Sequence, residues 1–508
     1  MGQVIYFGQP FSIFNTIVFC IQSVFIRVHL WLENVLLNSG VINNDTIVAL
    51  ATAQGVGAIG VIRLSGPQAI GITNSVFKGK NLTTQPSHTI HYGHIIEGDV
   101  TIDEVMVSLF RAPKSFTTED VVEISCHGSP YIAEQIIRLL IQQGARSAKP
   151  GEFTLRAFMH GRIDLSQAEA VADLIASNSS ASHDLAIKQM RGGFSHQIAA
   201  LRQRLVNFTS LIELELDFAE EDVEFANRDQ LIALIDEIQN ALRPLIESFR
   251  LGNVIKNGVN TVIIGKPNAG KSTLLNVLLN EERAIVSDIA GTTRDTIEEV
   301  MNLNGIQFRF IDTAGLRQTT DVIEKVGVEK ALEKLKQSSV YIYLFDVNTT
   351  TPEQLLADVQ ELALTDFNGL IVGNKIDSAH WEDTAAFLYV LKNNPVTNAA
   401  KLHEHLLFIS AGTNKLVDTL KERLFQLVTI NQRQGTETIV VSNMRHYEAL
   451  IRADETLLEI KLGIGNHITG ELISLELKRA LHHLGEISGE VTNDEILGNI
   501  FSKFCIGK

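Results

Sequence analysis

Cysteine is scarce in this chain of 508 residues: Cys20, Cys126 and Cys505 are its three, far apart and odd in number. Neither a disulfide framework nor a zinc ligand set can be read from them, and a reducing cytoplasm fits such usage. A surplus of basic residues is also lacking, because 43 Lys and Arg stand against 59 Asp and Glu and give a formal net charge of −16. That excludes a protein that coats nucleic acid by bulk attraction, and leaves only a local basic patch as a way to bind it.

Acidic residues are absent from residues 4–32, where Arg27 is the one fixed charge and residues 11–26 are dense in Phe, Ile and Val. A membrane helix needs roughly 20 apolar residues, but polar side chains dilute this stretch, and no charged segment precedes it as in a signal peptide. We expect residues 1–42 to be an apolar extension, which a start codon assigned too far upstream would also explain. The folded protein is then expected to begin near Asn43, and a membrane segment is the less favoured alternative.

Short strand-like runs broken by turns dominate the region before Phe153. Alternation of apolar residues predicts strands, and a spacing of three to four residues predicts a helix. The clearest strands cover 46–52, 57–66, 104–113 and 120–128, and a helix covers 130–144. Together they predict a compact α+β domain.

Proline is absent between Pro150 and Pro244, and the spacing of apolar residues there turns helical. Ser166 followed by Glu169 predicts a capping box at the start of the first of these helices. The same helical character returns after residue 435. The predicted helices cover 165–180, 185–194, 196–218, 229–249, 442–463 and 471–489.

Two helical stretches thus flank an alternating β/α segment, and the simplest architecture is a helical domain with a nucleotide-binding domain inserted into it. The predicted fold class is α/β multidomain: an N-terminal α+β domain, a central helical domain, and an inserted P-loop (Ras-like) G domain with a mainly parallel sheet. After the extension, the predicted domains are 43–158 (N-terminal), 159–257 (helical, first part), 258–430 (G domain) and 431–508 (helical, second part).

Residues 260–279 read as a strand, a Gly-rich loop and a helix, and match G-x-x-x-x-G-K-[ST] at Gly265, Gly270, Lys271 and Ser272. The glycines let backbone N–H groups curl around phosphates at the positive end of the following helix. Lys271 is expected to reach the β- and γ-phosphates, and Ser272 to offer its hydroxyl to Mg²⁺. This motif alone predicts a nucleotide hydrolase without naming the base.

Two further segments fit the phosphate end of such a site. A predicted strand ends in Asp312 and is followed closely by Gly315. An acidic residue there can hold the metal through water, and the glycine N–H can report the γ-phosphate. Upstream, Thr292 and Thr293 supply hydroxyls for metal and phosphate in a switch loop.

The base is specified by Asn374, Lys375 and Asp377 at a predicted strand end. A carboxylate accepts two hydrogen bonds from guanine N1–H and its exocyclic amine, a pairing that adenine cannot offer. Ser410 and Ala411 then support the guanine oxygen through the backbone. A lone N-K-x-D is commonly a surface turn, but four elements in the right order, each at a strand end, predict a GTP site.

Leu316 stands directly after Gly315, where many GTPases carry a water-orienting Gln. Leucine cannot orient water, so another group must do so, and Glu324 is the candidate. Two roles remain possible for Arg317: an arginine that acts on the transition state, or a solvated surface residue.

With these motifs placed, the chain resembles the MnmE (TrmE) family of tRNA-modification GTPases over about residues 43–508. The resemblance is carried by NDTIVA at 44–49, KPNAGKST in the P-loop, AGTTRD at 290–295, DTAGLR at 312–317 and the terminal FCIGK at 504–508. It implies a homodimer formed through the N-terminal domain, which binds a 5-formyltetrahydrofolate-type cofactor. It also implies an FAD-dependent MnmG-type partner that completes a heterotetramer.

For this family, the implied reaction adds a carboxymethylaminomethyl-type group to C5 of the wobble uridine (position 34) of certain tRNAs, using a tetrahydrofolate one-carbon unit. GTP hydrolysis is implied to depend on K⁺, which sits where an arginine finger would otherwise act, and G domains are implied to meet across the dimer. No membrane partner is expected.

The resemblance also implies roles for single residues. Ser272 and Thr293 resemble the Mg²⁺ ligands, and the K⁺ ligands are Asn268, Ser287, Ile289 and Thr292. Glu324 resembles the residue that helps position water, and with Lys271 and Cys505 it forms the predicted catalytic set. The predicted GTP-binding set is Asn268, Ala269, Gly270, Lys271, Ser272, Thr273, Ser287, Asp288, Ile289, Ala290, Gly291, Thr292, Thr293, Asp312, Thr313, Ala314, Gly315, Asn374, Lys375, Asp377, Ser410, Ala411 and Gly412.

For the folate, the resemblance implies Arg63, Glu123, Arg162 and Lys508 as ligands. Arg162 stands where relatives carry Lys, which keeps the charge and changes its geometry. Thr118 stands where Gly is expected.

Cys505 fits a prenylation signal badly, and is open between assisting chemistry near the folate and packing. His88, His91 and His94 are not expected to bind a metal, because a strand-and-turn segment would not place them on one face.

Two alternatives remain at this level. An RNA-binding GTPase of ribosome assembly would act as a switch without covalent chemistry, but the inserted G domain and FCIGK favour tRNA modification. A membrane-attached mechanochemical GTPase rests only on the extension at 1–42.

Overall fold

The computed structural model describes residues 45–218, 227–282, 299–311, 332–366, 368–378, 381–395, 397, 401–429, 439–466, 468–492 and 494–507. The chain divides into two compact units, Met1–Ala168 with Thr492–Lys508, and Glu169–Val491.

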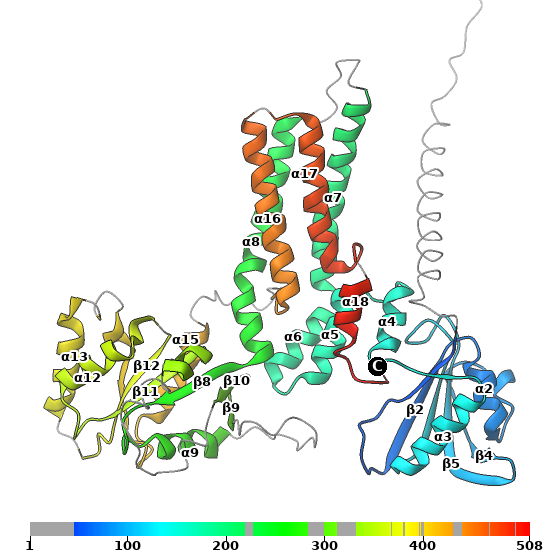
Figure 1. The fold of residues 1–508 in the computed structure, drawn as a ribbon, viewed down its shortest axis with the longest axis horizontal. Coiled ribbons are helices and arrows are strands. Elements are labelled where there is room, and N and C mark those ends of the chain that lie inside the picture. Colours follow the sequence, from blue (N-terminus) through cyan, green and yellow to red (C-terminus); the bar gives the residue numbers. More distant parts are fainter. Residues whose placement is uncertain are drawn as a thin grey trace, which may run out of the picture. The chain divides into compact units, whose positions relative to one another are not determined.

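The first unit is built on a seven-stranded sheet with the strand order β3-β4-β5-β6-β2-β1-β7. Its neighbours are antiparallel except β1 and β7, which pair in parallel. Helices α2 (Ala69–Val76) and α3 (Pro130–Gln142) share one hydrophobic core with this sheet (Figure 1). The strands are β1 (Ile47–Leu50), β2 (Ile59–Ser65), β3 (Phe77–Lys78), β4 (Thr89–Glu97), β5 (Val100–Phe110), β6 (Val121–His127) and β7 (Arg146–Ser147), and η1 (Leu82–Thr84) is a short 3₁₀ turn.

Side chains alternate strictly across the central strands of this sheet, because successive residues of a strand point to opposite faces. Ile62 and Leu64 of β2 are fully buried against the helices, whereas Ile59 is 64% exposed. The other face, which we call the open face, carries Ile90 and Tyr92 from β4, Glu104, Met106 and Ser108 from β5, Glu123 and Ser125 from β6, and Ile59, Val61 and Arg63 from β2. Four of its apolar side chains, Ile59, Ile90, Tyr92 and Met106, are at least half exposed.

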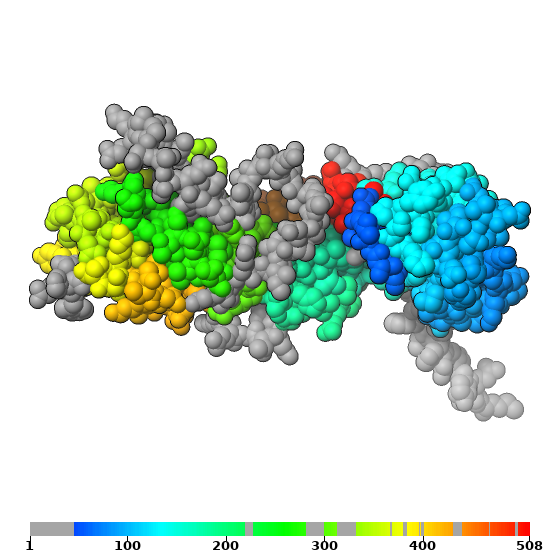
Figure 2. All heavy atoms as spheres, turned by 90° about the horizontal axis from the view of Figure 1, so that it is seen from below, coloured from blue at the N-terminus to red at the C-terminus, as the bar shows by residue number. Residues whose placement is uncertain are grey.

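The C-terminus of the chain packs in the first unit. Helix α18 (Asp494–Phe501) lies on α4 (Glu152–Met159), with the rings of Phe158 and Phe501 6.5 Å apart. Figure 2 shows these C-terminal atoms, in red, beside N-terminal atoms in blue. At Gly507, φ is +95° and a Cβ would come within 2.3 Å of the carbonyl oxygen of Leu50, so only glycine fits against β1 there.

The second unit contains a bundle of long helices, in which α16 packs on α17 and α8, and α17 packs on α7 (Figure 1). Asparagine side chains cap two of them: Asn227 accepts the N–H groups of Asp229 and Gln230 at α8, and Asn443 accepts that of Arg445 at α16. The core of the bundle is lined by apolar residues from all four. The helices are α5 (Leu165–Ala176, in this unit from Glu169), α6 (Ser180–Met190), α7 (Gly193–Asp217), α8 (Arg228–Asn257), α16 (Met444–Gly465) and α17 (Gly470–Ser488).

Two local predictions in the helices are wrong. The capping box of α5 is made by Asp164 and Gln167, each accepting the other's N–H, rather than by Ser166 and Glu169. Asp164 serves because its short carboxylate reaches the N–H of Gln167 at 2.9 Å, and Glu169 points instead to Arg445. The predicted helix over 185–194 is also broken, since Gly192 with φ +79° ends α6 and starts α7.

The rest of the second unit is a three-layer α/β segment. Its six-stranded sheet has the order β13-β12-β11-β8-β10-β9, and every pair is parallel except β9 with β10. Two separate hydrophobic clusters show that α9 and α15 cover one face, and α12 and α13 the other. The elements are β8 (Val259–Ile264), α9 (Lys271–Glu282), β9 (Glu299–Leu303), β10 (Ile306–Phe310), β11 (Val340–Asp346), α12 (Pro352–Glu361), η3 (Leu364–Asp366), β12 (Gly369–Asn374), α13 (Trp381–Asn393), η4 (Leu402–His405), β13 (Leu406–Phe408) and α15 (Val417–Thr429).

The predicted fold class is therefore confirmed: an α+β part, a helical part and an inserted α/β part with a mainly parallel sheet. The predicted domain boundaries stay predictions. In the described residues, no helix has both the length and the apolar character that crossing a membrane requires. The predicted extension 1–42 lies outside them.

Candidate functional site

The loop between β8 and α9 has the backbone of a phosphate cradle. Gly265 (φ +146°) and Gly270 (φ +99°) adopt conformations that disfavour other residues. A Cβ on Gly265 would meet the carbonyl oxygen of Leu344 at 2.0 Å, and one on Gly270 would meet Nδ2 of Asn374 at 2.3 Å. The loop thus lies directly on the neighbouring strand ends, and α9 starts at Lys271 with its N-terminal amides beside it.

Lys271 folds back onto this loop. Its Nζ donates to the carbonyl oxygens of Gly265 and Lys266, each at 2.8 Å. Burial, and then the charge of Lys334, lowers the pKa of Lys271 below its ordinary value. These carbonyl contacts hold the ammonium in the loop, where a phosphate oxygen could replace them.

Asn374 at the end of β12 connects two loops. One is the loop between β8 and α9, which we call the phosphate loop, and the other carries Ser410 and Ala411 and is called the guanine loop. Its Nδ2 donates to the carbonyl oxygen of Ala269 at 2.8 Å, and its Oδ1 accepts the N–H of Ala411 at 2.9 Å. Asn374 is 2% exposed, so both hydrogen bonds are buried. One side chain therefore fixes two loops that the sequence predicted to bind opposite ends of a nucleotide.

Lys375 is held by residues from the neighbouring strand. Its Nζ pairs with Oδ2 of Asp346 at 2.7 Å, at the end of β11. Asn348 donates to Oδ1 of Asp346 and to the carbonyl oxygen of Lys375. Burial would raise the pKa of Asp346, but Lys375 and Asn348 donate to it and hold that pKa below its usual range. Asp346 and Asn348 therefore set the direction in which Lys375 leaves the strand.

Asp377 presents an exposed carboxylate beside this cluster. A hydrogen bond from the Ser410 side chain is the main reason why the pKa of Asp377 lies below its ordinary value. Ser410 itself is buried and exchanges two backbone hydrogen bonds with Lys415, each 3.0 Å. The carboxylate of Asp377 is therefore an ionised acceptor at the edge of the site. Such an acceptor can bind two adjacent N–H donors of a base.

Several predicted nucleotide ligands lie outside the described residues. These are the switch residues Ser287, Asp288, Ile289, Ala290, Gly291, Thr292, Thr293, Asp312, Thr313, Ala314 and Gly315, with Leu316, Arg317 and Glu324. Among the predicted K⁺ ligands only Asn268 is described: it is exposed and has φ +61° in the phosphate loop.

A second constellation lies on the open face of the first unit. Arg63 and Glu123 are register partners on β2 and β6, and Nη2 of Arg63 approaches Oε1 of Glu123 to 2.8 Å. Nη1 of Arg63 donates to the carbonyl oxygen of Gly507 at 3.2 Å, and its guanidinium lies 5.7 Å from the Phe153 ring centre. The structure thus brings together two predicted folate residues and the C-terminal segment, while Lys508 lies outside the described residues.

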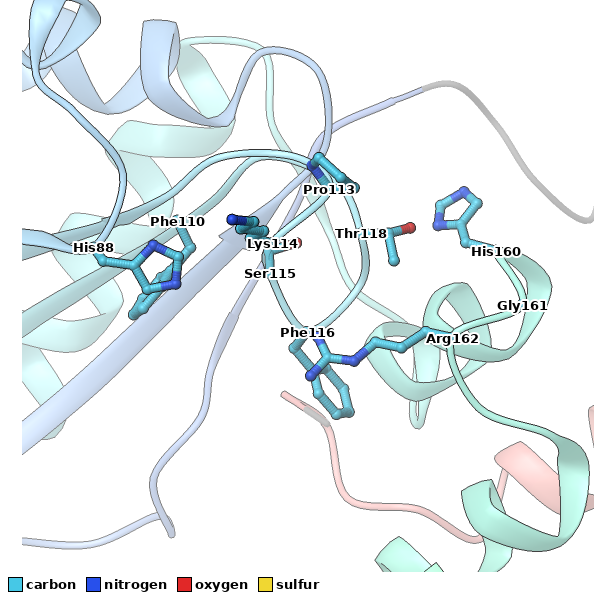
Figure 3. A pocket seen from close by; sticks show the side chains of 10 residues that line it. All are labelled: His88, Phe110, Pro113, Lys114, Ser115, Phe116, Thr118, His160, Gly161 and Arg162. Atoms are coloured by element: carbon cyan, nitrogen blue, oxygen red, sulfur yellow. The ribbon is translucent and has the colours of Figure 1, made fainter. Parts of the chain in front are cut away.

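Arg162, the fourth predicted folate residue, lines a pocket of about 660 Å³ in the same unit (Figure 3). Its guanidinium lies 5.5 Å from the centre of the Phe116 ring. Figure 3 shows the loop of Pro113 to Thr118 in the middle, His88 and Phe110 on one side, and His160 to Arg162 on the other. Thr118, found where Gly was expected, has φ +63°, a conformation that glycine adopts more readily.

The loop in the middle of this pocket is anchored by a buried ion network. Arg156, with a side chain 3% exposed, pairs with Asp45 at 2.6 Å, Glu119 at 3.1 Å and Glu152 at 3.2 Å. Arg146 pairs with Asp45 and Glu152, both at 2.6 Å. Burial would raise the pKa of Asp45 and of Glu152, but hydrogen bonds from these arginines outweigh it and lower both. Glu119 thereby fixes the end of the 113–119 loop.

The remaining predictions can be located as well. The backbone oxygen of Cys505 accepts a hydrogen bond from Gly151 N–H at 3.4 Å, and its side chain is exposed. His91 is buried, and His94 approaches Glu104 at 3.6 Å. Among the described residues no cluster of His, Cys, Asp or Glu could hold a metal ion.

Sequence reasoning missed Asp346 and Asn348 at the nucleotide site and Phe116 and Phe153 beneath the two arginines. A signal existed for the first pair, because the apolar run of β11 stops at Asp346 as β12 stops at Asn374. The phenylalanines gave none, since their contacts with arginines depend on the packing of α4 and the loop before it.

Comparisons with known proteins follow the same division. A family model described as the MnmE helical domain matches residues 165–505, and one described as the N-terminus of the GTP-binding protein TrmE matches residues 46–162. The tRNA modification GTPase MnmE of Cytophaga hutchinsonii is 54% identical over 466 residues, which cover 92% of this chain and 98% of that protein. The MnmE of Bacteroides thetaiotaomicron is 50% identical over 479 residues, covering 92% and 100%.

Solved structures match part of the chain. The Era protein of Aquifex aeolicus with GDP and AlF₄⁻ is 26% identical, with 39% of this chain and 67% of that chain covered and a TM-score of 0.26. A probable GTP-binding protein engB is 20% identical, with 34% and 99% covered and a TM-score of 0.26.

Proposed function

This chain belongs to the MnmE family of tRNA modification GTPases, and from that membership we propose that it hydrolyses GTP in order to modify a uridine of tRNA. The near-full-length relatives favour this function over the alternative of a ribosome-assembly switch. The modification proposed is a carboxymethylaminomethyl-type group at C5 of the wobble uridine, made together with an FAD-dependent partner.

The observation that carries the GTP site is the double role of Asn374. Because its amide bonds both Ala269 and Ala411, the phosphate loop and the guanine loop are held at a constant separation. The exposed carboxylate of Asp377 stands beside it, and its lowered pKa keeps it ionised at neutral pH. This arrangement supports selection of guanine, whose adjacent N–H groups both donate.

The phosphate end supports hydrolysis. Lys271 would exchange the carbonyls of Gly265 and Lys266 for β- and γ-phosphate oxygens when a nucleotide binds. The N-terminal amides of α9 would meet the same phosphates. Ser272, in the first turn of α9, would hold Mg²⁺ together with Thr293, and the ion would neutralise charge that develops on the leaving phosphate.

A potassium ion is proposed to add positive charge at the phosphates. Asn268 fits a ligand role: it is exposed in the phosphate loop, and within the described part of the chain its side-chain amide has no hydrogen-bond partner. Its amide oxygen is the type of donor that hard cations prefer. Ser287, Ile289 and Thr292 are proposed as the remaining ligands, and Glu324 as the residue that positions the attacking water.

A folate is proposed to bind on the open face. The aminopyrimidinone edge of a pterin offers adjacent N–H donors as guanine does, so the carboxylate of Glu123 fits it for the same reason as Asp377 fits guanine. Arg63 holds Glu123 in place and contacts the C-terminal segment that ends in Lys508. The folate would supply the one-carbon unit of the reaction.

A second copy of the chain is proposed to cover the open face. Ile59, Ile90, Tyr92 and Met106 are each at least half exposed on one side of the sheet. Exposed apolar side chains gathered on one face mark interaction surfaces. Homodimerisation there would also enclose the Arg63–Glu123 pair and exclude water from the folate.

The decisive experiment compares GTP hydrolysis in K⁺ and in Na⁺ at equal ionic strength and Mg²⁺. The wild-type chain should be stimulated at least about tenfold by K⁺, and Asn268→Ala should lose most of this stimulation while retaining nucleotide binding. Equal rates in both salts would remove the K⁺ mechanism and leave the GTPase. Modification itself is read by mass spectrometry of uridine 34 after incubation with the flavin partner and folate.

A further inference from the structure

The pocket of Figure 3 has a basic lining that the proposed function does not fully use. Lys114 and Arg162 contribute fixed positive charges, and His88 and His160 contribute imidazole rings. Where the structure describes the chain, no Asp or Glu lines this pocket. A protein of net charge −16 has here a concave surface that is suited to an anion.

The two fixed cations are available for a ligand. All four basic side chains are exposed. Neither Lys114 nor Arg162 takes part in an ion pair with any residue that the structure describes, whereas Arg156 and Arg146 of the same unit are paired with carboxylates. Nδ1 of His160 donates to the carbonyl oxygen of Thr117 at 2.6 Å, which turns the rest of the ring outward.

The pocket lies next to the Arg63–Glu123 pair. Glu123 faces Ser108 in the register of β6 and β5, and Phe110 of the pocket is the next residue of β5 on the same face. Such diagonal neighbours are roughly 7–8 Å apart. Phe116 packs on the cluster that contains Phe153, so the aromatic rings under Arg162 and Arg63 belong to one layer.

We propose that this pocket holds the glutamate tail of the folate and prefers tails lengthened by further γ-linked glutamates. This rests on the proposed folate site, because it takes the pterin end to be bound at Glu123. A folate has its ring at one end and carboxylates at the other, and the open face offers an acceptor at one end and cations at the other. Each additional glutamate brings one more carboxylate into reach of Lys114, Arg162 and the two histidines.

The expected gain follows from the exposure of these groups. An exposed ion pair strengthens an interaction by about 1.4- to 5-fold. Three additional carboxylates should therefore tighten binding by about tenfold in total. Since the pairs are open to solvent, most of this gain should disappear between about 50 and 500 mM NaCl, where the Debye length shrinks to a few ångström.

The test is calorimetric binding of 5-formyltetrahydrofolate with one glutamate and with four, to the full-length chain. Wild type should bind the longer tail about tenfold more tightly, and Lys114→Ala should reduce this ratio to about threefold or less. Lys80→Ala is the matched control, an exposed lysine of the same unit outside the pocket, and should keep the full ratio. Circular dichroism of each variant should match wild type.

The outcomes separate this inference from the function on which it rests. If the monoglutamate binds and the longer tail binds no more tightly, the tail pocket is refuted while the folate site stands. If neither ligand binds, both fail. A ratio that survives in Lys114→Ala, with weaker tRNA binding instead, would assign the pocket to a phosphate backbone and overturn the inference.

Discussion

In the nucleotide-binding segment, the residues predicted to face the ligand lie within a few positions of a strand end, whereas the predicted site of the first unit is assembled from distant parts of the chain. Asn374, Lys375 and Asp377 leave β12 together, beside the loop that follows β8. Arg63 meets Glu123 only because β2 pairs with β6, and meets Gly507 from 444 positions away. The first kind of site can be recognised from a short sequence motif, whereas the second kind depends on the fold of the entire unit.

The comparison also concerns how each site is held. The nucleotide loops are joined by neutral hydrogen bonds through one buried amide. The pocket loop of the first unit is anchored by Arg156 among three carboxylates. Removing a charge from such a network leaves other charges buried and unpaired, which costs more than losing a neutral hydrogen bond.

The largest effect is therefore expected from Arg156→Met. It should lower the free energy of local opening in the first unit by about 3–5 kcal/mol at pH 7, because Glu119 loses its ion partner and Asp45 and Glu152 keep only Arg146. Native-state hydrogen exchange at β1 measures this directly. Arg138→Met is the control: its pair with Glu97 is exposed and should contribute less than about 1 kcal/mol.

Acid should reduce the difference in stability between wild type and Arg156→Met. Asp45 and Glu152 have pKa values lowered below 3.8 and 4.5, so their contribution to stability is complete above pH 4.5 and is lost as the pH falls through the folded values. Wild type should lose stability below about pH 4.5 more steeply than Arg156→Met. A gap between the two proteins that stays constant down to pH 3 would mean that packing, not charge, anchors the loop.

The next largest effect concerns catalysis in the nucleotide segment. Lys271→Ala should lower the turnover of GTP at least about 100-fold, as removal of a single charge-stabilising donor does in other enzymes. Lys392→Ala, at the exposed last turn of α13, is the control for net charge and should turn over GTP at the wild-type rate. A loss below about fivefold in Lys271→Ala would contradict its placement at the phosphates.

Smaller effects are expected in the N-K-x-D motif, where Asn374 should stabilise the two loops and Asp377 should bind the base. Asn374→Ala leaves the buried carbonyl of Ala269 and the N–H of Ala411 without a partner, and should cost about 2–3 kcal/mol of local stability. Asp377→Ala should leave stability unchanged because the carboxylate is exposed, and should weaken GDP binding by about 10- to 100-fold. Hydrogen exchange at β12 and titration with a fluorescent GDP analogue measure the two.

If Asp377→Ala destabilises the segment as much as Asn374→Ala, the two residues do not have separate roles in stability and in base binding. Should Asn374→Ala retain full stability, the link between the two loops would lie elsewhere. Either result would mean that the nucleotide loops, like the pocket loop of the first unit, are stabilised by several residues together.

These differences explain how much could be predicted. The inserted α/β segment, its parallel sheet and the order of its loops follow from apolar strands that end in polar motifs, since parallel strands bring those ends to one edge. The pairing of Lys375 with Asp346 could not be predicted, because both strands end in polar residues and only the spatial order β12-β11-β8 selects the partner. The α5 cap was assigned wrongly since Asp164 and Ser166 both match a capping pattern, and geometry decides between them.

In the first unit, strand alternation predicts that Arg63 and Glu123 lie opposite the buried residues of their strands, but not that they face each other. That contact needs the register of β2 with β6. Phe116 and Phe153 reach the arginines through packing that no short pattern encodes. The resemblance to a family predicted Arg63 and Glu123 as site residues, whereas it gave no indication of Phe116 and Phe153.

The smallest effect tests the register contact itself. Glu123→Gln keeps the shape of the side chain and removes its charge, so the exposed-edge pair with Arg63 should cost less than about 1 kcal/mol of stability. Binding of the monoglutamyl folate should weaken by about tenfold, because a neutral amide replaces an acceptor carboxylate at the pterin edge. Glu104→Gln is the matched control on the same open face, 59% exposed and away from Arg63. Equal weakening in both variants would attribute the effect to net charge, and a selective loss in Glu123→Gln would mean that strand register alone, without any local motif, builds a ligand site.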